Sequence, residues 1–213
     1  MSQQPTTHNP QTGFTLIELT ISIAIFGILA VTVLTGFRNA DRIEAFRHDA
    51  SLLASDLRAV QNRALAGALD NSGEFPRGGY GLRIEECNTP PCTYLFWREK
   101  DDPPDQRILD LTGTEVQGTT MMSKYTKVLS VVVQDPGGLN QSQATQAQMS
   151  FKPPRPTPFV WWAAPPGEPQ PIPATNGIEG KQVMITLSFT DDPTIQRVIE
   201  VKGISGQISV YAP

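Results

Sequence analysis

The N-terminal part of the chain shows two hydrophobic patterns in succession. Residues 14–37 form an apolar run, roughly 36 Å long as a helix and therefore long enough to cross the hydrocarbon core of a bilayer. Beyond it, apolar residues recur in steps of three and four with charged residues between them, which predicts an amphipathic helix. The apolar positions are Ile43, Phe46, Ala50, Leu53, Leu57, Val60 and Ala64.

These two patterns predict one continuous helix, because no proline lies between Pro10 and Pro76. The helix is expected to span about 55 residues, on the order of 80 Å. We expect it to end between Ala68 and Gly73, where Gly67 and the run 70–73 provide stop signals. The apolar stripe of its second half is interpreted as part of a core rather than as a coiled-coil seam.

The rest of the chain alternates between apolar and polar residues and predicts strands. Segments 79–84 and 93–97 are expected to form a hairpin with residues 88–91 at its tip. Further strands are expected at 107–111, 128–134, 148–152, 183–189, 197–201 and 207–211. Half-buried alternation implies an antiparallel sheet with one face available for the helix stripe. The expected fold class is therefore α+β, a long N-terminal helix packed on an antiparallel β-sheet.

Two segments are expected to lack regular structure. Prolines crowd residues 153–173 and are expected to exclude a helix or a central strand. Two interpretations of this segment stay open: a long loop pinned over the sheet by its aromatic residues, or a partner-recognition segment that exposes Trp161 and Trp162. Residues 140–148, rich in Gln, Ser, Ala and Thr, are expected to form a flexible surface loop.

Composition and charge narrow the function further. The 213 residues include 17 basic and 21 acidic ones, a net charge of -4, which argues against a general polyanion binder. No phosphate-binding loop or catalytic constellation is present, and His48 falls on the polar side of the helix. The aspartates within 101–105 and 191–193 lie beside prolines and are interpreted as turn residues rather than calcium ligands. We predict no catalytic residue, no metal site and no cofactor.

A single carboxylate interrupts the apolar run near its start. Residues 13–19 read Gly-Phe-Thr-Leu-Ile-Glu-Leu, so Glu18 lies at membrane depth, where a charge costs at least ~2.5 kcal/mol. Such a residue is a functional hypothesis that needs a partner, and an amine is the obvious one. Cutting the chain after Gly13 would create an amine on Phe14, one helical turn before Glu18.

This N-terminus resembles that of the type IV prepilin superfamily, which comprises pilins of type IV pili and pseudopilins of type II secretion. The resemblance implies that prepilin peptidase cuts between Gly13 and Phe14, that Phe14 is N-methylated, and that Glu18 acts in assembly. One departure is that family leaders usually carry Lys or Arg, whereas residues 1–13 carry neither. An ordinary secretory signal peptide is disfavoured, because it would show a basic start and a small-residue cleavage site.

The same resemblance implies location and partners. The protein would be a single-pass protein of the inner membrane with its C-terminal domain extracytoplasmic, and would enter a cell-surface or periplasmic filament after assembly. Its partners would be prepilin peptidase, other pilins or pseudopilins, the inner-membrane assembly platform and membrane lipid, with no nucleic acid favoured. On that oxidising side, Cys87 and Cys92 are expected to form a disulfide that closes the hairpin tip.

A looser resemblance to the GspH/FimT group of minor pseudopilins and minor pilins covers more of the chain. It is carried by residues 56–64, 79–82 and 198–210. The expected organisation is a leader (1–13), a transmembrane half-helix (14–37), an amphipathic half-helix (38–70) and a β-rich ectodomain (71–213). We expect a structural, minor subunit of a type II secretion pseudopilus or type IV pilus. The alternative is a DNA-binding FimT-like minor pilin, which the charge-balanced C-terminal hairpin disfavours.

Overall fold

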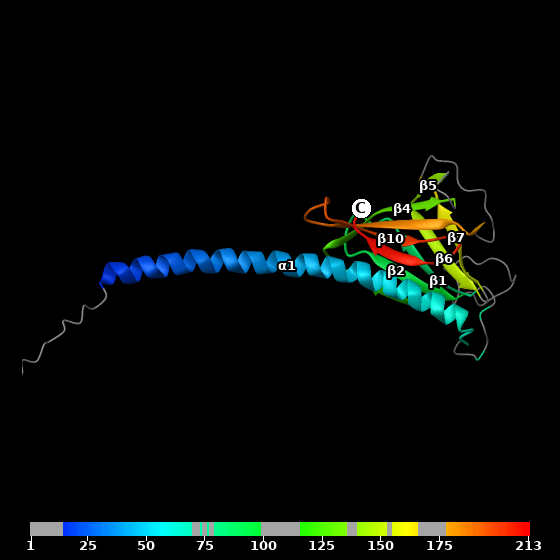
Figure 1. Ribbon diagram of the computed structural model, residues 1–213, viewed down its shortest axis with the longest axis horizontal. Helices are drawn as coiled ribbons and strands as arrows, with labels where there is room; N and C mark the ends of the chain where they lie inside the picture. The colour runs from blue at the N-terminus through cyan, green and yellow to red at the C-terminus, as the bar shows by residue number, and fades with distance from the viewer. Residues whose placement is uncertain are drawn as a thin grey trace, which may run out of the picture. The chain divides into compact units, whose positions relative to one another are not determined.

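The computed structural model describes residues 15–69, 73, 76, 79–98, 116–135, 140–152, 155–165 and 178–213; for Thr35, Arg155 and Pro156 it describes the backbone alone. The chain forms two compact units, Met1–Asp41 and Arg42–Pro213. One helix, α1 (Leu16–Leu65), contributes its first part to the N-terminal unit and its second part to the C-terminal unit (Figure 1). Antiparallel strands make up most of the rest, so the expected α+β fold class is confirmed.

The first part of α1 is apolar on every side. Its large apolar side chains between Leu16 and Phe37 are all 53–81% exposed. A helix that is apolar all round is normally covered by lipid or by other helices. Among the described residues, α1 is the one helix long and apolar enough to cross a membrane, by length and composition.

The second part of α1 buries the predicted stripe. Six of its seven apolar residues are buried in the core of the C-terminal unit, and Ile43 packs against them. The interpretation of the stripe as core is therefore confirmed. Burying a side chain of Leu size stabilises a fold by about 1.5–3 kcal/mol, so this face fixes the helix on the strands.

The helix ends at Leu65, slightly before the predicted range. Gly67 adopts a left-handed φ of 62°, the Gly67 N–H donates to the Ala64 carbonyl, and the Ala68 N–H donates to the Arg63 carbonyl. These two bonds form a Schellman cap, which satisfies carbonyls that the helix itself leaves unpaired. Glycine favours that conformation because it carries no Cβ.

The strands form two antiparallel sheets rather than the single sheet expected from the sequence. The first has the order β3-β2-β1-β6-β7-β8 and comprises β1 (Tyr80–Glu85), β2 (Thr93–Arg98), β3 (Val116–Met121), β6 (Gln146–Lys152), β7 (Arg155–Ala163) and β8 (Ile178–Glu179). The predicted hairpin of residues 79–84 and 93–97 is confirmed as β1–β2, with Leu82 opposite Phe96.

The second sheet has the order β11-β10-β9-β4-β5. It comprises β4 (Thr126–Gln134), β5 (Gln141–Ala144), β9 (Gln182–Phe189), β10 (Gln196–Val201) and β11 (Ile208–Tyr211). A bridge between Cys87 and Val128 links the two sheets. Figure 1 shows β1 and β2 beside the second part of α1. Buried residues of α1 and of both sheets form one core.

The expectation of a segment without regular structure at residues 153–173 is wrong for residues 155–163, which form a strand; residues 153, 154 and 166–173 lie outside the described residues. Strand β7 occupies Arg155–Ala163 and pairs with β6 along most of its length. Its other side pairs with β8 at only Phe159 and Val160, so most of that side behaves as a sheet edge. Proline is tolerated there because it lacks only a donor, and Pro158 still accepts a hydrogen bond from the Gly180 N–H.

The expected loop at residues 140–148 is also a strand region. It contains β5 and the first residues of β6. Among the described strands, β5 pairs with β4 alone, and its polar side chains are exposed or half-buried at this edge. The predicted strand at 107–111 lies outside the described residues.

Candidate assembly site

The first turn of α1 holds the carboxylate that the sequence singles out. Thr15 immediately precedes the helix, and both its backbone N–H and its hydroxyl donate to Glu18 Oε2, at 3.0 and 2.9 Å. In return, the Glu18 N–H donates to the Thr15 hydroxyl at 3.3 Å. Thr15 and Glu18 therefore form a capping box, in which each side chain satisfies the other residue's backbone donor.

The capping box places the negative charge where a helix tolerates it best. The first backbone N–H groups of a helix have no partner within it, and its dipole favours an anion at this end. A carboxylate in an apolar surrounding is costly unless it is hydrogen-bonded. Two short-range donors from Thr15 therefore reduce the cost of carrying Glu18 on an apolar helix.

Sequence reasoning missed Thr15. The Thr-x-x-Glu spacing of Thr15 and Glu18 is a capping-box signature and was available in the sequence. The structure thus adds a second residue to the predicted site. Gly13 and Phe14, the proposed cleavage and methylation residues, lie outside the described residues.

Glu18 is the only charged residue between Thr15 and Phe37. The hydroxyls of Thr20 and Ser22 donate back to the helix carbonyls of Ile17 and Glu18, at 2.9 and 2.7 Å. These hydroxyls are therefore engaged within the helix. Glu18 is consequently the one group on this surface that can form an ion pair with a neighbour.

The hairpin between β1 and β2 carries the two cysteines. Cys87 and Cys92 are joined in the structure, and their Cα atoms lie 5.8 Å apart. That separation falls in the range that a disulfide spans without moving the backbone. The predicted bond thus fits the fold, and its presence in the mature protein is a prediction for thiol chemistry to test.

The remaining candidate residues take structural positions. His48 is exposed on α1. Asp192 accepts hydrogen bonds from the Thr194 hydroxyl at 2.6 Å and the Thr194 N–H at 3.0 Å, and these bonds lower the pKa of Asp192. Asp192 is therefore a turn residue. No group of three metal-ligating side chains occurs among the described residues, and residues 101–105 lie outside them.

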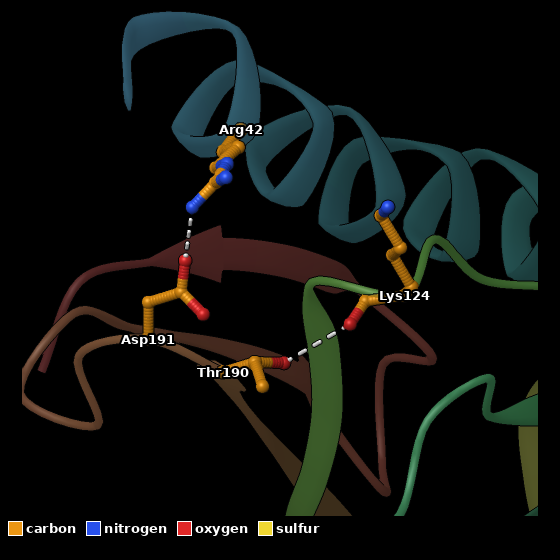
Figure 2. A network of polar contacts seen from close by, with 4 residues as sticks. All are labelled: Arg42, Lys124, Thr190 and Asp191. Carbon is orange, nitrogen blue, oxygen red and sulfur yellow. Dashed lines mark hydrogen bonds and ion pairs between the residues drawn. The ribbon is translucent and has the colours of Figure 1, made fainter. Parts of the chain in front are cut away.

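A polar network fastens the start of the C-terminal unit to its strands. Figure 2 shows Arg42 of α1 reaching Asp191 of the β9–β10 loop, and Thr190 donating to the Lys124 carbonyl. The Arg42–Asp191 ion pair is 2.9 Å long, and both side chains are more than 40% exposed, so it contributes about 0–1 kcal/mol. The Arg42 guanidinium also lies 5.5 Å from the centre of the Tyr125 ring.

The tryptophans of β7 differ in exposure. Trp162 is 8% exposed and belongs to the core, with Lys181 Nζ 5.7 Å from its ring centre. Trp161 is half-buried. The aromatic residues thus anchor this segment, as the first interpretation expected, although they do so within a strand. Recognition of a partner through an exposed Trp162 is excluded by its burial.

Comparison with known proteins identifies the N-terminal segment. Residues 8–34 match the prokaryotic N-terminal methylation motif. No curated protein and no solved structure matches the chain. The motif supports a type IV prepilin-like protein, and proteins with this pilin-type motif are structural subunits rather than enzymes. It also implies processing by prepilin peptidase, assembly with other pilins, and membrane anchoring.

Proposed function

We propose that this chain is a structural, minor subunit of a type II secretion pseudopilus or a type IV pilus. Prepilin peptidase cuts between Gly13 and Phe14, and the new Phe14 amine is methylated. Glu18 then pairs with the Phe14 amine of a neighbouring subunit. The observation that carries the proposal is one carboxylate in the first turn of an exposed apolar helix, inside the methylation motif.

In this proposal, the apolar part of α1 lies first in the membrane and then in the filament. Before assembly, residues 14–37 hold the subunit in the inner membrane, with the C-terminal unit on the extracytoplasmic side. After assembly, the same residues pack against other subunits in the filament. A side-chain surface 53–81% exposed suits both lipid and neighbouring helices.

Assignment to the GspH/FimT group is part of the proposal. The segments that resemble the group lie in the second part of α1, in β1, and in the β10–β11 hairpin. Side chains of α1 reach that hairpin, because Arg58 Nη2 donates to the Ile208 carbonyl at 3.0 Å and Gln61 Nε2 donates to the Gly206 carbonyl at 2.9 Å. Both contacts support a hairpin whose main role is to pack on the helix.

The alternative, a DNA-binding minor pilin, has less support. Phosphate binding requires several cations that are not paired within the protein. The β10–β11 hairpin offers Arg197 and Lys202, while Glu200 lies between them and accepts hydrogen bonds from Gln182 and Ser209. From Lys181 to the end of the chain, the three cations Lys181, Arg197 and Lys202 are balanced by Asp191, Asp192 and Glu200, so we favour the structural role.

Mass spectrometry of the N-terminus tests the proposal. The full chain is expressed with a prepilin peptidase and purified from membranes. The expected product starts at Phe14 and carries one additional methyl group, whereas Gly13→Val is expected to stay a full-length precursor. A native chain that keeps Met1, or that is cut after the apolar run instead, contradicts the proposed processing.

A further inference from the structure

Strand β3 is the end strand of the first sheet among the residues that the structure describes. In the described part of the chain, β3 pairs with β2 alone. Its sequence, Val-Gln-Gly-Thr-Thr-Met, contains neither a charged residue nor proline, the features that usually keep exposed edges from pairing with another chain. A register shift occurs near Val116, but Gly118 to Met121 pair regularly with β2. Four residues therefore present a regular edge.

A groove of about 320 Å³ opens beside this edge, between α1 and the strands. Ala59 and Val60 of α1 and Phe96 of β2 supply apolar lining. Gly118 lies opposite Phe96, and a Cβ added at Gly118 would meet no atom within 4 Å. The groove thus has space for a side chain that β3 itself does not provide.

One positively charged side chain, that of Arg63, lines this groove. Arg63 is exposed, lines the groove, and lies 4.7 Å from the centre of the Tyr80 ring. It forms no ion pair with any residue that the structure describes. The other charged lining residue, Asp56, accepts a hydrogen bond from the Tyr94 hydroxyl at 2.6 Å. A ligand that matches the charge of this groove therefore places a carboxylate next to Arg63.

We propose that the β3 edge and this groove bind an extended segment of a different subunit of the same filament. The segment adds to β3 as a strand, and side chains two positions apart point to the same face. An apolar side chain enters the groove across from Gly118, where directly opposite residues come within about 5 Å. An acidic side chain on the same face pairs with Arg63. This inference rests on the proposed function.

The β3 strand of a second copy does not fit the same edge. Two β3 strands paired antiparallel are related by a twofold axis perpendicular to the sheet, and that rotation also reverses the direction of α1. Two subunits anchored in one membrane, or aligned in one filament, have their helices parallel. This excludes a pair of two β3 strands, so we assign the edge to a strand of another subunit.

A labelled peptide tests the chemistry of the site on the full chain in detergent micelles. The probe is Thr-Val-Thr-Leu-Thr-Glu-Thr, which places Leu and Glu on one face of a strand; the control replaces Glu by Lys. Fluorescence anisotropy is expected to show saturable binding of the probe and at least about tenfold weaker binding of the control. Arg63→Glu is expected to reverse this preference.

A matched pair of variants tests the groove. Gly118→Leu fills the open space and is expected to weaken probe binding at least about tenfold, whereas Thr119→Leu, on the opposite face of β3, is expected to bind as the native chain does. The proposal is overturned if the probe shows no saturable binding at millimolar concentration. It is also overturned if Gly118→Leu binds the probe as tightly as the native chain does. The same holds if Arg63→Glu still prefers the Glu peptide over the Lys peptide. If the probe does not bind but the N-terminus is methylated Phe14, the edge-binding proposal fails while the proposed function keeps its support. The two failures are therefore distinguishable.

Discussion

A hydrogen bond between β2 and α1 predicts how stability responds to mutation and pH. Tyr94 is 1% exposed, and its hydroxyl donates to the Asp56 carboxylate at 2.6 Å. Removing the hydroxyl with Tyr94→Phe leaves that carboxylate without this donor. Hydrogen bonds to charged groups contribute roughly 1.5–3 kcal/mol, so the variant is expected to lose about that much free energy of unfolding near neutral pH.

The pH dependence gives a sharper test of the same contact. Burial, and then the hydrogen bond to Asp56, raise the pKa of Tyr94 above its ordinary value of 10.0. Because the folded state holds this proton more tightly than the unfolded state, the stabilisation is complete below pH 10. It falls by about 1.4 kcal/mol for each pH unit above that value. The advantage of the native chain over Tyr94→Phe is therefore expected to disappear at roughly pH 11–12.

Urea unfolding of the full chain in detergent, followed by tryptophan fluorescence, measures both quantities. Tyr80→Phe is the matched control, because the Tyr80 hydroxyl also donates toward the end of α1, to the neutral Ala68 carbonyl at 3.0 Å. Tyr80→Phe is expected to lower the free energy of unfolding by only about 0.5–1.5 kcal/mol. If the free energies of unfolding of the native chain and Tyr94→Phe differ by the same amount at pH 8 and at high pH, the assigned contact is refuted.

Three further predictions concern the core, the hairpin tip and nucleic acid. Leu53→Ala is expected to lower the free energy of unfolding by about 2–5 kcal/mol, and exposed Ser51→Ala by less than about 0.5, in the same urea assay. Alkylation of the unreduced mature chain is expected to label neither Cys87 nor Cys92; labelling of both would contradict the disulfide. In a mobility-shift titration at physiological salt, duplex DNA is expected to bind only at the non-specific level, because the charges from Lys181 to the end of the chain cancel. Sub-micromolar binding with a steep salt dependence would contradict this expectation.

The helix was predictable because its signals are local. An apolar run followed by a regular spacing of three and four describes α1 without knowledge of its partners. Asp49 escapes this reasoning, because it is one of the charged residues between the apolar positions. It is 6% exposed and accepts hydrogen bonds from the Ser123 N–H and the Thr126 hydroxyl. Its burial depends on the turn before β4, which no local pattern predicts.

The sheets were only partly predictable, because pairing is not a local property. The hairpins β1–β2 and β10–β11 follow from short turns between alternating segments. Alternation could not show that β1 also pairs with β6, or that β4 pairs with β9. It therefore could not divide the strands into two sheets. Strand β7 was hidden by prolines that occupy a largely unpaired edge.

The assembly site was predictable as a motif and incomplete as a structure. Residues 13–19 identify Glu18 by its charge in an apolar run. They do not by themselves show what holds the carboxylate. The structure supplies Thr15, whose two donors satisfy Glu18 within its own chain. In our account, the amine of Phe14 in a neighbouring subunit later joins or replaces these donors.

We propose that processing depends on Gly13, whereas assembly depends on the charge of Glu18. Glu18→Ala leaves the bond between Gly13 and Phe14 intact, so this variant is expected to be cut and methylated. It lacks the carboxylate that we propose pairs with a neighbour's amine, and an uncharged helix is also more stable in lipid. The variant is therefore expected to stay in the membrane. Thr20→Ala is the matched control, because the Thr20 hydroxyl bonds only within its own helix turn.

The most direct measurement is the amount of processed subunit in filaments sheared from a compatible host. We expect the native chain and Thr20→Ala to be present in the sheared fraction. Glu18→Ala is expected only in the membrane fraction, with an N-terminus at methylated Phe14 by mass spectrometry. Entry of Glu18→Ala into filaments at the native level would contradict the pairing of Glu18 with Phe14.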